Sequence, residues 1–463
     1  MTEKDLITHV ASVGSSGISR RGFLAAAGLA GIAASSALAA CTNSDTKSGK
    51  SGSASSPASV GPDTFKGVTL NIGCNPTDVQ PAQAAGALWA AKTGGKVNAV
   101  VIPYAERATD YATMIVSKDP HYDVLFASVD FVSNFGDRIY DDLGDLGGMT
   151  KDLIPAAMNQ LKKGGKLFAA PLFADMEFFI YNKQDWTAAG LDPNKVPTTW
   201  SELYALAPKL NTGGRAANVT PWNTIGVPYW ISMYNSLGGQ LFNEDKTQVL
   251  FDNDKALKTW QTVEAGFKQQ FFGIAAANAT GDADTQLLFN QNLGASEINT
   301  TGFWSQVLGS DPAFKLQIKK EDVGVVIMPG IDPGTSGSII VAEGFGVNKF
   351  GTQKEAALDF VKFTVSPEFQ KQLVLGKAGT VLPTSSISVS GDKEVASSFP
   401  IAPLLAEQAK HQLTWPGNAP YNWNAPFLLG LTNISKGTWD AHTAHTETVK
   451  AVKKLAVDYI AAN

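Results

Sequence analysis

The first ordered part of this 463-residue chain alternates between strand-like and helix-like patterns. Three runs with strand character are separated by two with helical character, at residues 66–73, 79–92, 97–102, 104–118 and 122–126. Such alternation predicts βαβ units with parallel strands, and therefore an α/β fold. In these sheets ligands bind beyond the carboxyl ends of the strands. Asp130 comes just past the third strand, in that position.

Two later segments carry sequence signals for helix starts. Thr199-Trp200-Ser201-Glu202 has the spacing of a capping box and predicts a helix that begins there. Ser366-Pro367 combines an N-cap residue with proline at the first helical position, after a helix predicted over 353–364.

Composition limits the kind of protein and ligand. Hydrophobic residues make up 44% of the chain, which at this length favours two lobes, each with its own core. The formal net charge of −5 is spread along the sequence, so we expect no nucleic-acid partner. After residue 40 the only arginines are Arg107, Arg138 and Arg215, which disfavours a phosphate or carboxylate ligand.

The N-terminus has the features of an export signal. Arg20-Arg21 precedes a short apolar run rich in Ala and Gly, as in signals of the twin-arginine (Tat) route. Leu38-Ala39-Ala40-Cys41 resembles the lipobox of bacterial lipoproteins, which implies lipidation of Cys41 and cleavage before it. We therefore predict a Tat-type signal peptide over 1–40, and an extracytoplasmic protein anchored to the cell membrane.

A polar segment follows Cys41 and separates it from the first strand. Residues 42–64 are almost all small or polar, and with Cys41 they are predicted to form a flexible linker over 41–64. Cys74 is the one other cysteine, so a lipidated Cys41 leaves no intramolecular disulfide.

Four blocks of sequence resemble the maltose-binding-like (family 1) carbohydrate-binding proteins of ABC importers. In order and spacing they extend over nearly all of residues 66–385. They are 122–130 with Leu143-Gly144-Asp145-Leu146; 166–171 with Asp175, Tyr181-Asn182-Lys183 and 199–203; 238–243; and 356–370. The second block is the most specific.

This resemblance implies a two-lobed periplasmic-binding-protein fold with three interlobe crossovers, near 171–175, 339–346 and 380–383. One lobe would comprise 66–172 and 344–380, and the other 173–343 and 381–463. The family's ligand lies in the interlobe cleft, and its closed form docks on a membrane permease. We expect a monomer without cofactor or catalytic residues.

The resemblance also implies which residues hold the ligand. Sugar hydroxyls are bound well by carboxylates and amides, and sugar faces stack on aromatic rings. Asp130, Asp175 and Trp304 match pocket positions of the family. Further candidates lie in regions that supply aromatic or polar contacts in relatives: Trp222, Tyr229, Trp230, Trp415, Asn418, Tyr421, Trp423, Glu343, Asn75 and Asp78. Glu343 departs from the family, in which two small residues are common at 343 and 344.

Three other interpretations remain open at this stage. The same fold can bind a polyamine or a zwitterionic osmolyte through aromatic and acidic side chains. Asp130 with Asp175 or Glu343 resembles the carboxylate pair of a surface glycoside hydrolase. His442 and His445 have the spacing of metal ligands, although we expect a solvated C-terminal helix there and no metal.

Overall fold

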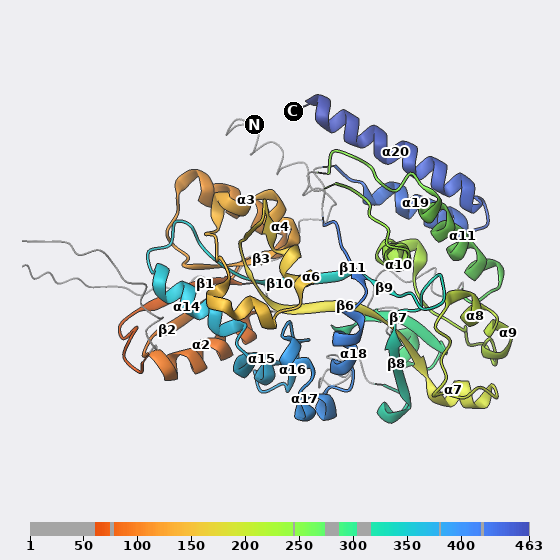
Figure 1. The fold of residues 1–463 in the computed structure, drawn as a ribbon, viewed down its shortest axis with the longest axis horizontal. Helices are drawn as coiled ribbons and strands as arrows, with labels where there is room; N and C mark the ends of the chain where they lie inside the picture. Colours follow the sequence, from red (N-terminus) through yellow and green to blue (C-terminus); the bar gives the residue numbers. More distant parts are fainter. Residues whose placement is uncertain are drawn as a thin grey trace, which may run out of the picture.

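The computed structural model describes residues 61–74, 78–243, 246–273, 287–302, 316–378, 381–417 and 421–462. Two α/β lobes lie side by side, and two long strands run from one to the other (Figure 1). The lobe that begins the chain lies on the left of the view, and the lobe that contains the C-terminal helices lies on the right.

The first lobe is built from the N-terminal βαβ units. Its elements before the first shared strand are β1 (Thr69–Cys74), α2 (Val79–Thr93), β2 (Lys96–Val101), α3 (Tyr104–Ser117), β3 (Val124–Ser128), α4 (Val129–Asn134), α5 (Gly136–Ile139), the 3-10 helix η2 (Leu146–Asp152), α6 (Pro155–Gln160), β4 (Lys162–Lys163) and β5 (Lys166–Leu167). β1 pairs in parallel with both β2 and β3, so the predicted parallel units are confirmed.

The strand β6 (Ala170–Asn182) then leads into the second lobe. That lobe holds α7 (Lys183–Ala188), α8 (Trp200–Tyr204), α9 (Ala207–Leu210), α10 (Trp222–Ser236), α11 (Asp254–Lys268), β7 (Ser296–Thr300), the 3-10 helix η5 (Lys320–Asp322), β8 (Val323–Ile327) and β9 (Gly337–Ser338). The strand β10 (Ile340–Val347) returns to the first lobe.

The rest of the chain completes both lobes. α14 (Lys354–Thr364) and α15 (Pro367–Val374) pack on the first lobe. The short helices α16 (Ile387–Ser390), α17 (Lys393–Ser398) and α18 (Ala402–Gln408) lie together below β6 in the view of Figure 1. β11 (Gln412–Leu413), α19 (Asn424–Ser435) and α20 (Ala441–Ala462) follow in the second lobe.

One continuous sheet joins the lobes. Its strand order is β2-β1-β3-β10-β6-β7, and β8 also pairs with β6. β10 is antiparallel to both β3 and β6. Each lobe nevertheless has its own core, and the two cores meet on β6, where Phe178 packs in the first and Phe179 in the second. A third buried cluster packs Val374 of α15 and residues of α16–α18 against Ile180 and Val219 of the second lobe. Most apolar burial thus lies within one lobe or the other, and the shared strands connect the lobes.

The local helix signals are confirmed. Thr199 is the N-cap of α8; its hydroxyl accepts from the backbone N–H of Glu202 and donates to the Glu202 carboxylate at 2.8 Å. The hydroxyl of Ser366 accepts from the N–H of Phe369 at 3.3 Å and caps α15. Both signals were readable because a cap is decided by residues within one turn.

The side-chain amide of Gln370 is buried and links the third interlobe connection, near residues 384–385, to the first, which is the start of β6. The side chain of Gln370, on α15, donates to the carbonyl of Leu172 on β6 at 2.7 Å. Its oxygen accepts from the hydroxyl of Thr384 at 2.7 Å and from the N–H of Ser385 at 3.0 Å. The hydroxyl of Ser385 in turn donates to the carbonyl of Pro171 at 2.6 Å. Residues 384–385 therefore lie directly against the start of β6.

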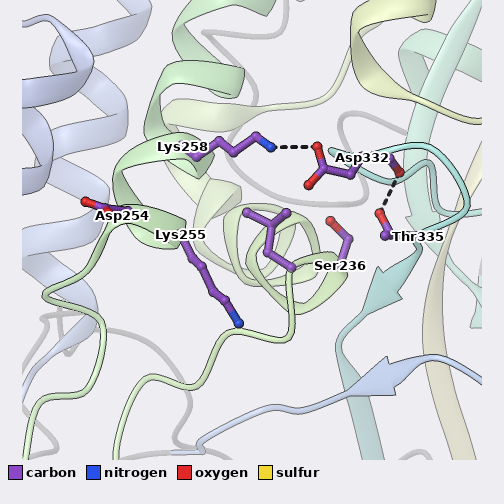
Figure 2. A pocket seen from close by; sticks show the side chains of 7 residues that line it. Ser236, Asp254, Lys255, Lys258, Asp332 and Thr335 are labelled. Atoms are coloured by element: carbon purple, nitrogen blue, oxygen red, sulfur yellow. Dashed lines mark hydrogen bonds and ion pairs between the residues drawn. The ribbon is translucent and has the colours of Figure 1, made fainter.

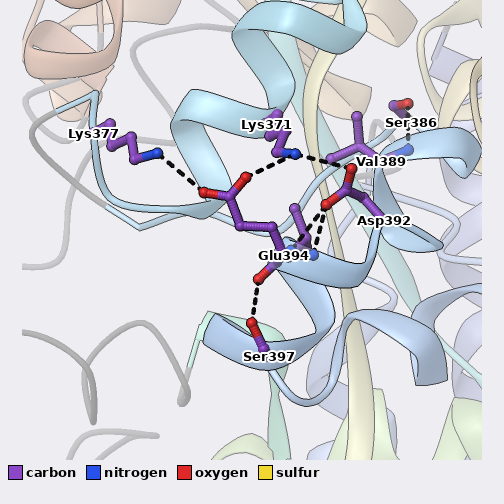
Figure 3. Close-up of polar contacts among 8 residues, drawn as sticks. Lys371, Lys377, Ser386, Val389, Asp392, Glu394 and Ser397 are labelled. Atoms are coloured by element: carbon purple, nitrogen blue, oxygen red, sulfur yellow. Dashed lines mark hydrogen bonds and ion pairs between the residues drawn. The ribbon is translucent and has the colours of Figure 1, made fainter.

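Beside this cluster, ion pairs join α15 to α17 at the surface. Lys371 lies between the carboxylates of Asp392 and Glu394, each 2.9 Å away, and Lys377 contacts Glu394 at 3.2 Å (Figure 3). All four side chains are substantially exposed, so solvent and salt screen these pairs and they contribute little to stability. Within the described residues, no helix combines the length and apolarity needed to cross a membrane.

We predict that Gln370→Ala lowers the free energy of unfolding by about 2–4 kcal/mol, because it leaves buried carbonyl and hydroxyl groups without partners. Gln372→Ala, on the same helix but partly exposed, is the matched control and should change it by less than about 1 kcal/mol. Urea unfolding of both variants measures the difference. Equal effects would show that the Gln370 bonds do not stabilise the junction.

Candidate functional site

The pairing of the shared strands is irregular at one point. The register of β10 against β6 shifts between Glu343 and Gly344. A Cβ on Gly344 would lie 1.9 Å from the carbonyl oxygen of Ala170, so only glycine fits there. Glu343 stands opposite Ser128 of β3 and Phe173 of β6. This bulge brings a carboxylate to the middle of the sheet, between the lobes.

Polar groups gather at the carboxyl ends of β1, β2 and β3, as the fold predicts. Asp78 stands just before α2 and is 1% exposed. Arg107 on α3 is fully buried; its guanidinium carbon lies 4.4 Å from the ring centre of Phe126, and Nη2 donates to the carbonyl of Ile102 at 3.1 Å. The aromatic face and the carbonyl hold this cation at the edge of the first lobe.

Ser128 occupies the N-cap position of α4 without capping it. Its side chain makes no cap hydrogen bond, it is 5% exposed, and its Oγ has no hydrogen-bond partner in the described structure. Because Ser128 is paired with Glu343 across β3 and β10, the hydroxyl and the carboxyl share one face of the sheet. A buried hydroxyl without a partner costs stability, so this one is available to a ligand.

The electrostatics of the junction centre on Glu343. Burial raises the pKa of its carboxyl from 4.5 to about 8, and the negative charge of Asp78 adds to the rise. Arg107 opposes the shift, while Asp175 and Asp130 increase it further. The side chain keeps partial access to solvent even though desolvation is the largest cause of its shift. Glu343 is therefore mostly a neutral acid at pH 7.

Asp175 faces the site from β6. It accepts hydrogen bonds from the hydroxyl of Thr301 and, at 3.2 Å, from the N–H of Gly302. Burial raises the pKa of its carboxyl, although these hydrogen bonds act in the opposite direction. The segment after β7 is thereby tied to the first shared strand, two residues before the predicted position Trp304, which lies outside the described residues.

The two lobes are in contact along one edge, where residues 415–417 of the second lobe lie against Asp130 and Gln160 of the first; we call this edge the rim. The first-turn residue Asp130 of α4 lies beneath Gly417, where a Cβ would approach Asp130 Oδ1 to 2.9 Å and Val129 Cγ2 to 3.0 Å. The amide of Gln160 on α6 donates to the carbonyl of Trp415 at 2.9 Å. The two lobes are therefore in contact along this edge.

Lys246 of the second lobe interacts electrostatically with Asp130 of the first. Burial lowers the pKa of its ammonium, and the negative charge of Asp130 opposes that shift. The phenol of Tyr421 donates to the carbonyl of Lys246 at 2.8 Å, which fixes this backbone at the rim. Two of the predicted residues, Asp130 and Tyr421, thus meet at the same edge.

The indole of Trp423 is 3% exposed and supports this rim from below. Its Nε1 donates to the carbonyl of Gly417 at 3.1 Å, and its ring meets that of Trp415 edge to face at 5.9 Å. Trp415 itself is partly exposed. Trp423 therefore positions the rim, whereas Trp415 retains accessible surface.

Three other predicted aromatics are packed in the second core instead. Trp222 is 2% exposed, Tyr229 is 3% exposed and Trp230 is fully buried. The ring of Trp230 packs against Trp260 at 5.3 Å and Phe427 at 4.9 Å. In this conformation the whole surface of Trp230 is used in packing within the second core. Trp222 and Tyr229 contribute mainly to packing.

Other expectations meet the structure only in part. Asn75 and Asn418, and Cys41 with the signal and linker up to residue 60, lie outside the described residues. The prediction of a solvated C-terminal helix is wrong for His445, which is buried on α20 with Nε2 3.2 Å from the carbonyl of Phe251. The described residues contain no group of three His, Cys, Asp or Glu side chains arranged to hold a metal.

A separate hollow of about 330 Å³ opens on the second lobe, between α10, the start of α11 and the loop before β9. Lys258 and Asp332 point toward each other across it and pair at 2.6 Å (Figure 2). Both side chains are about half exposed, as surface ion pairs are. The hollow contains none of the predicted ligand residues.

Sequence reasoning missed several residues of the junction. Arg107 was counted only as a rare arginine, although its position shortly after the second strand places it at the ligand edge. Lys246, Gln160 and Gly417 gave no local signal, because their role depends on contacts across the lobes. Ser128 was readable in principle, since it ends the third strand two residues before Asp130.

Comparison with known proteins gives the context of this fold. Residues 75–371 match the family model described as bacterial extracellular solute-binding protein. The sugar-binding protein MalE from Xanthomonas citri has a similar structure, with a TM-score of 0.72 at 15% identity over 85% of this chain and 98% of that one. The predicted two-lobed α/β fold is thus confirmed.

Two curated proteins are related in sequence. A probable amino-acid ABC transporter periplasmic-binding protein from Sinorhizobium fredii is 26% identical over 250 residues, which are 53% of this chain and 53% of that protein. The match therefore spans about half of that relative. The diacetylchitobiose-binding protein DasA of Streptomyces coelicolor is 23% identical over 324 residues, or 68% of this chain and 72% of the relative.

We predict that Gly417→Ala separates the lobes at the rim, because the added methyl group meets Asp130 and Val129. Gly437→Ala is the matched control: it has a similar φ of +67°, but no atom lies within 4 Å of the new Cβ. Both variants carry the same backbone strain, about 1–2 kcal/mol. Energy transfer between dyes on Lys96→Cys and Lys209→Cys should report a longer interlobe distance in Gly417→Ala alone. Identical distances in both variants would contradict the rim contact.

A second prediction concerns stability against pH. With a folded pKa of about 8 and an ordinary value of 4.5, Glu343 keeps a proton that the unfolded chain releases, so stability falls as pH rises between these values. Glu343→Gln should therefore gain stability relative to the unmodified protein, by about 4 kcal/mol from pH 5 to 8.5. Urea unfolding across this range measures the gain.

Glu394→Gln is the control for this measurement. Lys371 lowers the pKa of the Glu394 carboxyl, so that group does not titrate between pH 5 and 8.5 and its removal shifts stability by a constant amount. Parallel pH profiles for Glu343→Gln and the unmodified protein would show that Glu343 has an ordinary pKa.

Proposed function

Because the chain belongs to the family of bacterial extracellular solute-binding proteins, we propose that it captures a carbohydrate between its lobes and presents it to the permease of an ABC importer. The family consists of binding proteins and not of enzymes, so the carboxylates of the site are assigned to recognition rather than to glycoside hydrolysis. No bond is made or broken in this function.

One observation supports the proposal most strongly. Asp130 of the first lobe and Asp175 of the first shared strand both act electrostatically on Glu343, at the bulge where the lobes join. Carboxylate oxygens accept hydrogen bonds from vicinal hydroxyls, and the acid of Glu343 can also donate one. This donor and acceptor set suits a polyhydroxylated ligand.

The relatives favour the same ligand class. The Streptomyces coelicolor relative is named for diacetylchitobiose, and the Xanthomonas citri structure is that of a sugar-binding protein. We assign the hydroxyl contacts to Asp130, Asp175, Asp78 and Glu343. Trp415 and Tyr421 are proposed to cover the ligand at the rim. Trp304, Asn75 and Asn418 remain predictions from the sequence.

Closure is proposed to follow from the shared strands. A ligand that bonds to Asp130 on one side and to Asp175 on the other gains full affinity only when the lobes meet, so it shifts the population toward the closed form. The contacts of Gln160 and Gly417 join the two lobes in the described conformation and would be lost if the lobes moved apart. The permease would then bind the closed conformation of the two lobes.

Export and anchoring are part of the same proposal. The twin arginines at 20–21 and the lipobox before Cys41 support Tat export followed by lipidation, which would hold the receptor on the outer side of the cell membrane. Metabolic labelling with a radioactive fatty acid tests this. We expect label on the unmodified protein and none on Cys41→Ala; equal labelling would refute the anchor.

We predict a ligand-dependent increase in melting temperature in a panel of sugars, polyols and amino acids. A carbohydrate at 100 times its Kd should stabilise the native state by ~2.7 kcal/mol. Asp130→Asn and Asp175→Asn should each weaken binding by about 10–100-fold, since each removes a charged acceptor. Asp252→Asn, at a half-exposed ion pair with Lys453, is the control and should bind normally.

Two results of the same ligand panel would contradict the proposal. Stabilisation by amino acids alone would move the function to that ligand class, which the name of the Sinorhizobium fredii relative makes a fair comparison. Binding that survives in both Asp130→Asn and Asp175→Asn would place the ligand elsewhere.

A further inference from the structure

The strand β6 is buried on one face and accessible on the other where it passes between the lobes. Leu172, Ala174 and Met176 are buried, whereas Phe173 and Asp175 keep some accessible surface. Because successive side chains of a strand point to opposite faces of the sheet, Phe173 and Asp175 point to the same side. One face of β6 therefore belongs to the core, and the other is accessible at these two positions.

The neighbouring strand β10 repeats this pattern in register. Val341 and Glu343 keep some accessible surface, and the residues on either side of Val341 are buried. Val341 is paired with Asp175 and Glu343 with Phe173, and directly paired side chains lie on the same face of a sheet. The four accessible side chains therefore form one continuous patch between the lobes, which we call the floor: Phe173, Asp175, Val341 and Glu343.

The hydroxyl of Ser128 extends the floor onto β3. Ser128 is paired with Glu343 between β3 and β10, so its side chain lies on the same side of the sheet. It is 5% exposed, makes no cap bond and has no hydrogen-bond partner for Oγ in the described structure. A buried hydroxyl without a partner destabilises the native state, so its presence here indicates a role in binding rather than in folding.

Phe173 gives the floor an aromatic ring. The ring packs in part on the core of the first lobe and keeps some accessible surface. Phe173, Glu343 and Ser128 form a row across β6, β10 and β3, which brings an aromatic ring, a carboxyl and a hydroxyl together. A pyranose matches this row, because its C–H face packs on an aromatic ring while hydroxyls at its edge bond to polar groups. An acyclic polyol has similar hydroxyls but no such face.

We propose that the solute is a pyranose sugar that lies on the floor, with one face stacked on Phe173 and adjacent hydroxyls bonded to Glu343 and Ser128. The inference rests on the proposed function, since it takes for granted that a carbohydrate enters this cleft. It adds Phe173 and Ser128 to the carboxylates assigned to binding, and it selects ring sugars over acyclic polyols.

Calorimetric titration of the purified protein with matched probes tests the need for a ring. Glucose, mannose, galactose and xylose are each compared with the alditol made by reducing them, which keeps the hydroxyls and loses the ring. Maltose and cellobiose are included to detect a site that needs more than one ring. We expect a pyranose that binds to do so at least about tenfold more tightly than its alditol.

A substitution at Phe173 tests the stacking. Phe173→Leu keeps an apolar side chain and removes the aromatic face, so it should weaken binding of the sugar about fivefold. Phe363→Leu on α14 is the matched control, because its ring is also partly buried on the first core and packs on Phe369. The control should bind the sugar normally. Equal weakening in both variants would show an effect of core packing and contradict the stacking.

A substitution at Ser128 gives two measurements of opposite sign. Ser128→Ala should weaken binding of the sugar about fivefold, whereas the melting temperature of the ligand-free protein should stay the same or rise, because a buried hydroxyl without a partner is removed. A hydroxyl with a structural role would give the reverse result. A lower melting temperature with unchanged affinity would therefore contradict the assignment of Ser128.

The outcomes separate this inference from the function on which it rests. Alditols that bind as tightly as their sugars, or unchanged affinity in both Phe173→Leu and Ser128→Ala, would overturn the inference and leave a carbohydrate receptor intact. If no sugar or alditol binds, both the inference and the proposed function fail.

Discussion

The pairing of β6 with β10 is the constraint on which the rest of the structure depends. These two strands are the backbone of both lobes, and each also pairs with strands that belong to only one of them. The apolar cores lie on either side, divided between Phe178 and Phe179. Because most of the apolar burial lies within one lobe or the other, a hinge motion about the shared strands can leave both cores intact. Gln370 limits that bending by binding residues 384–385 to the start of β6.

The same pairing explains the chemistry of the junction. A bulge at Glu343 and Gly344 turns a carboxylate toward the space between the lobes, where burial and the neighbouring carboxylates raise its pKa. Arg107, fixed on two aromatic rings, only partly compensates. An acid kept neutral in this way is a switchable donor, and its protonation depends on what lies beside it. The residue proposed to bind the ligand, Glu343, therefore lies on the strand about which the lobes are proposed to close.

Local sequence signals predicted local structure well. The capping box at Thr199, the cap at Ser366 and the parallel βαβ units depend on neighbouring residues, and all three are confirmed. Asp130 was placed correctly at a strand end because the geometry of parallel sheets puts it there. Aromatics were harder: the same tryptophan that stacks on a sugar also fills a core, and only tertiary packing separated Trp230 from Trp415. Gln370, Lys246 and Gly417 act through partners far apart in sequence, which no local pattern encodes.

The central claim is that Glu343, at the bulge between the lobes, is a neutral acid that meets the ligand. Carbon-13 NMR of side-chain carboxyl groups tests it directly, with Glu343→Gln used to assign the resonance. We expect the Glu343 carboxyl to titrate near pH 8 in the free protein and its titration to shift when a sugar that stabilises the protein binds. A carboxyl that titrates near 4.5, and that is unchanged by any sugar that stabilises the protein, would contradict it.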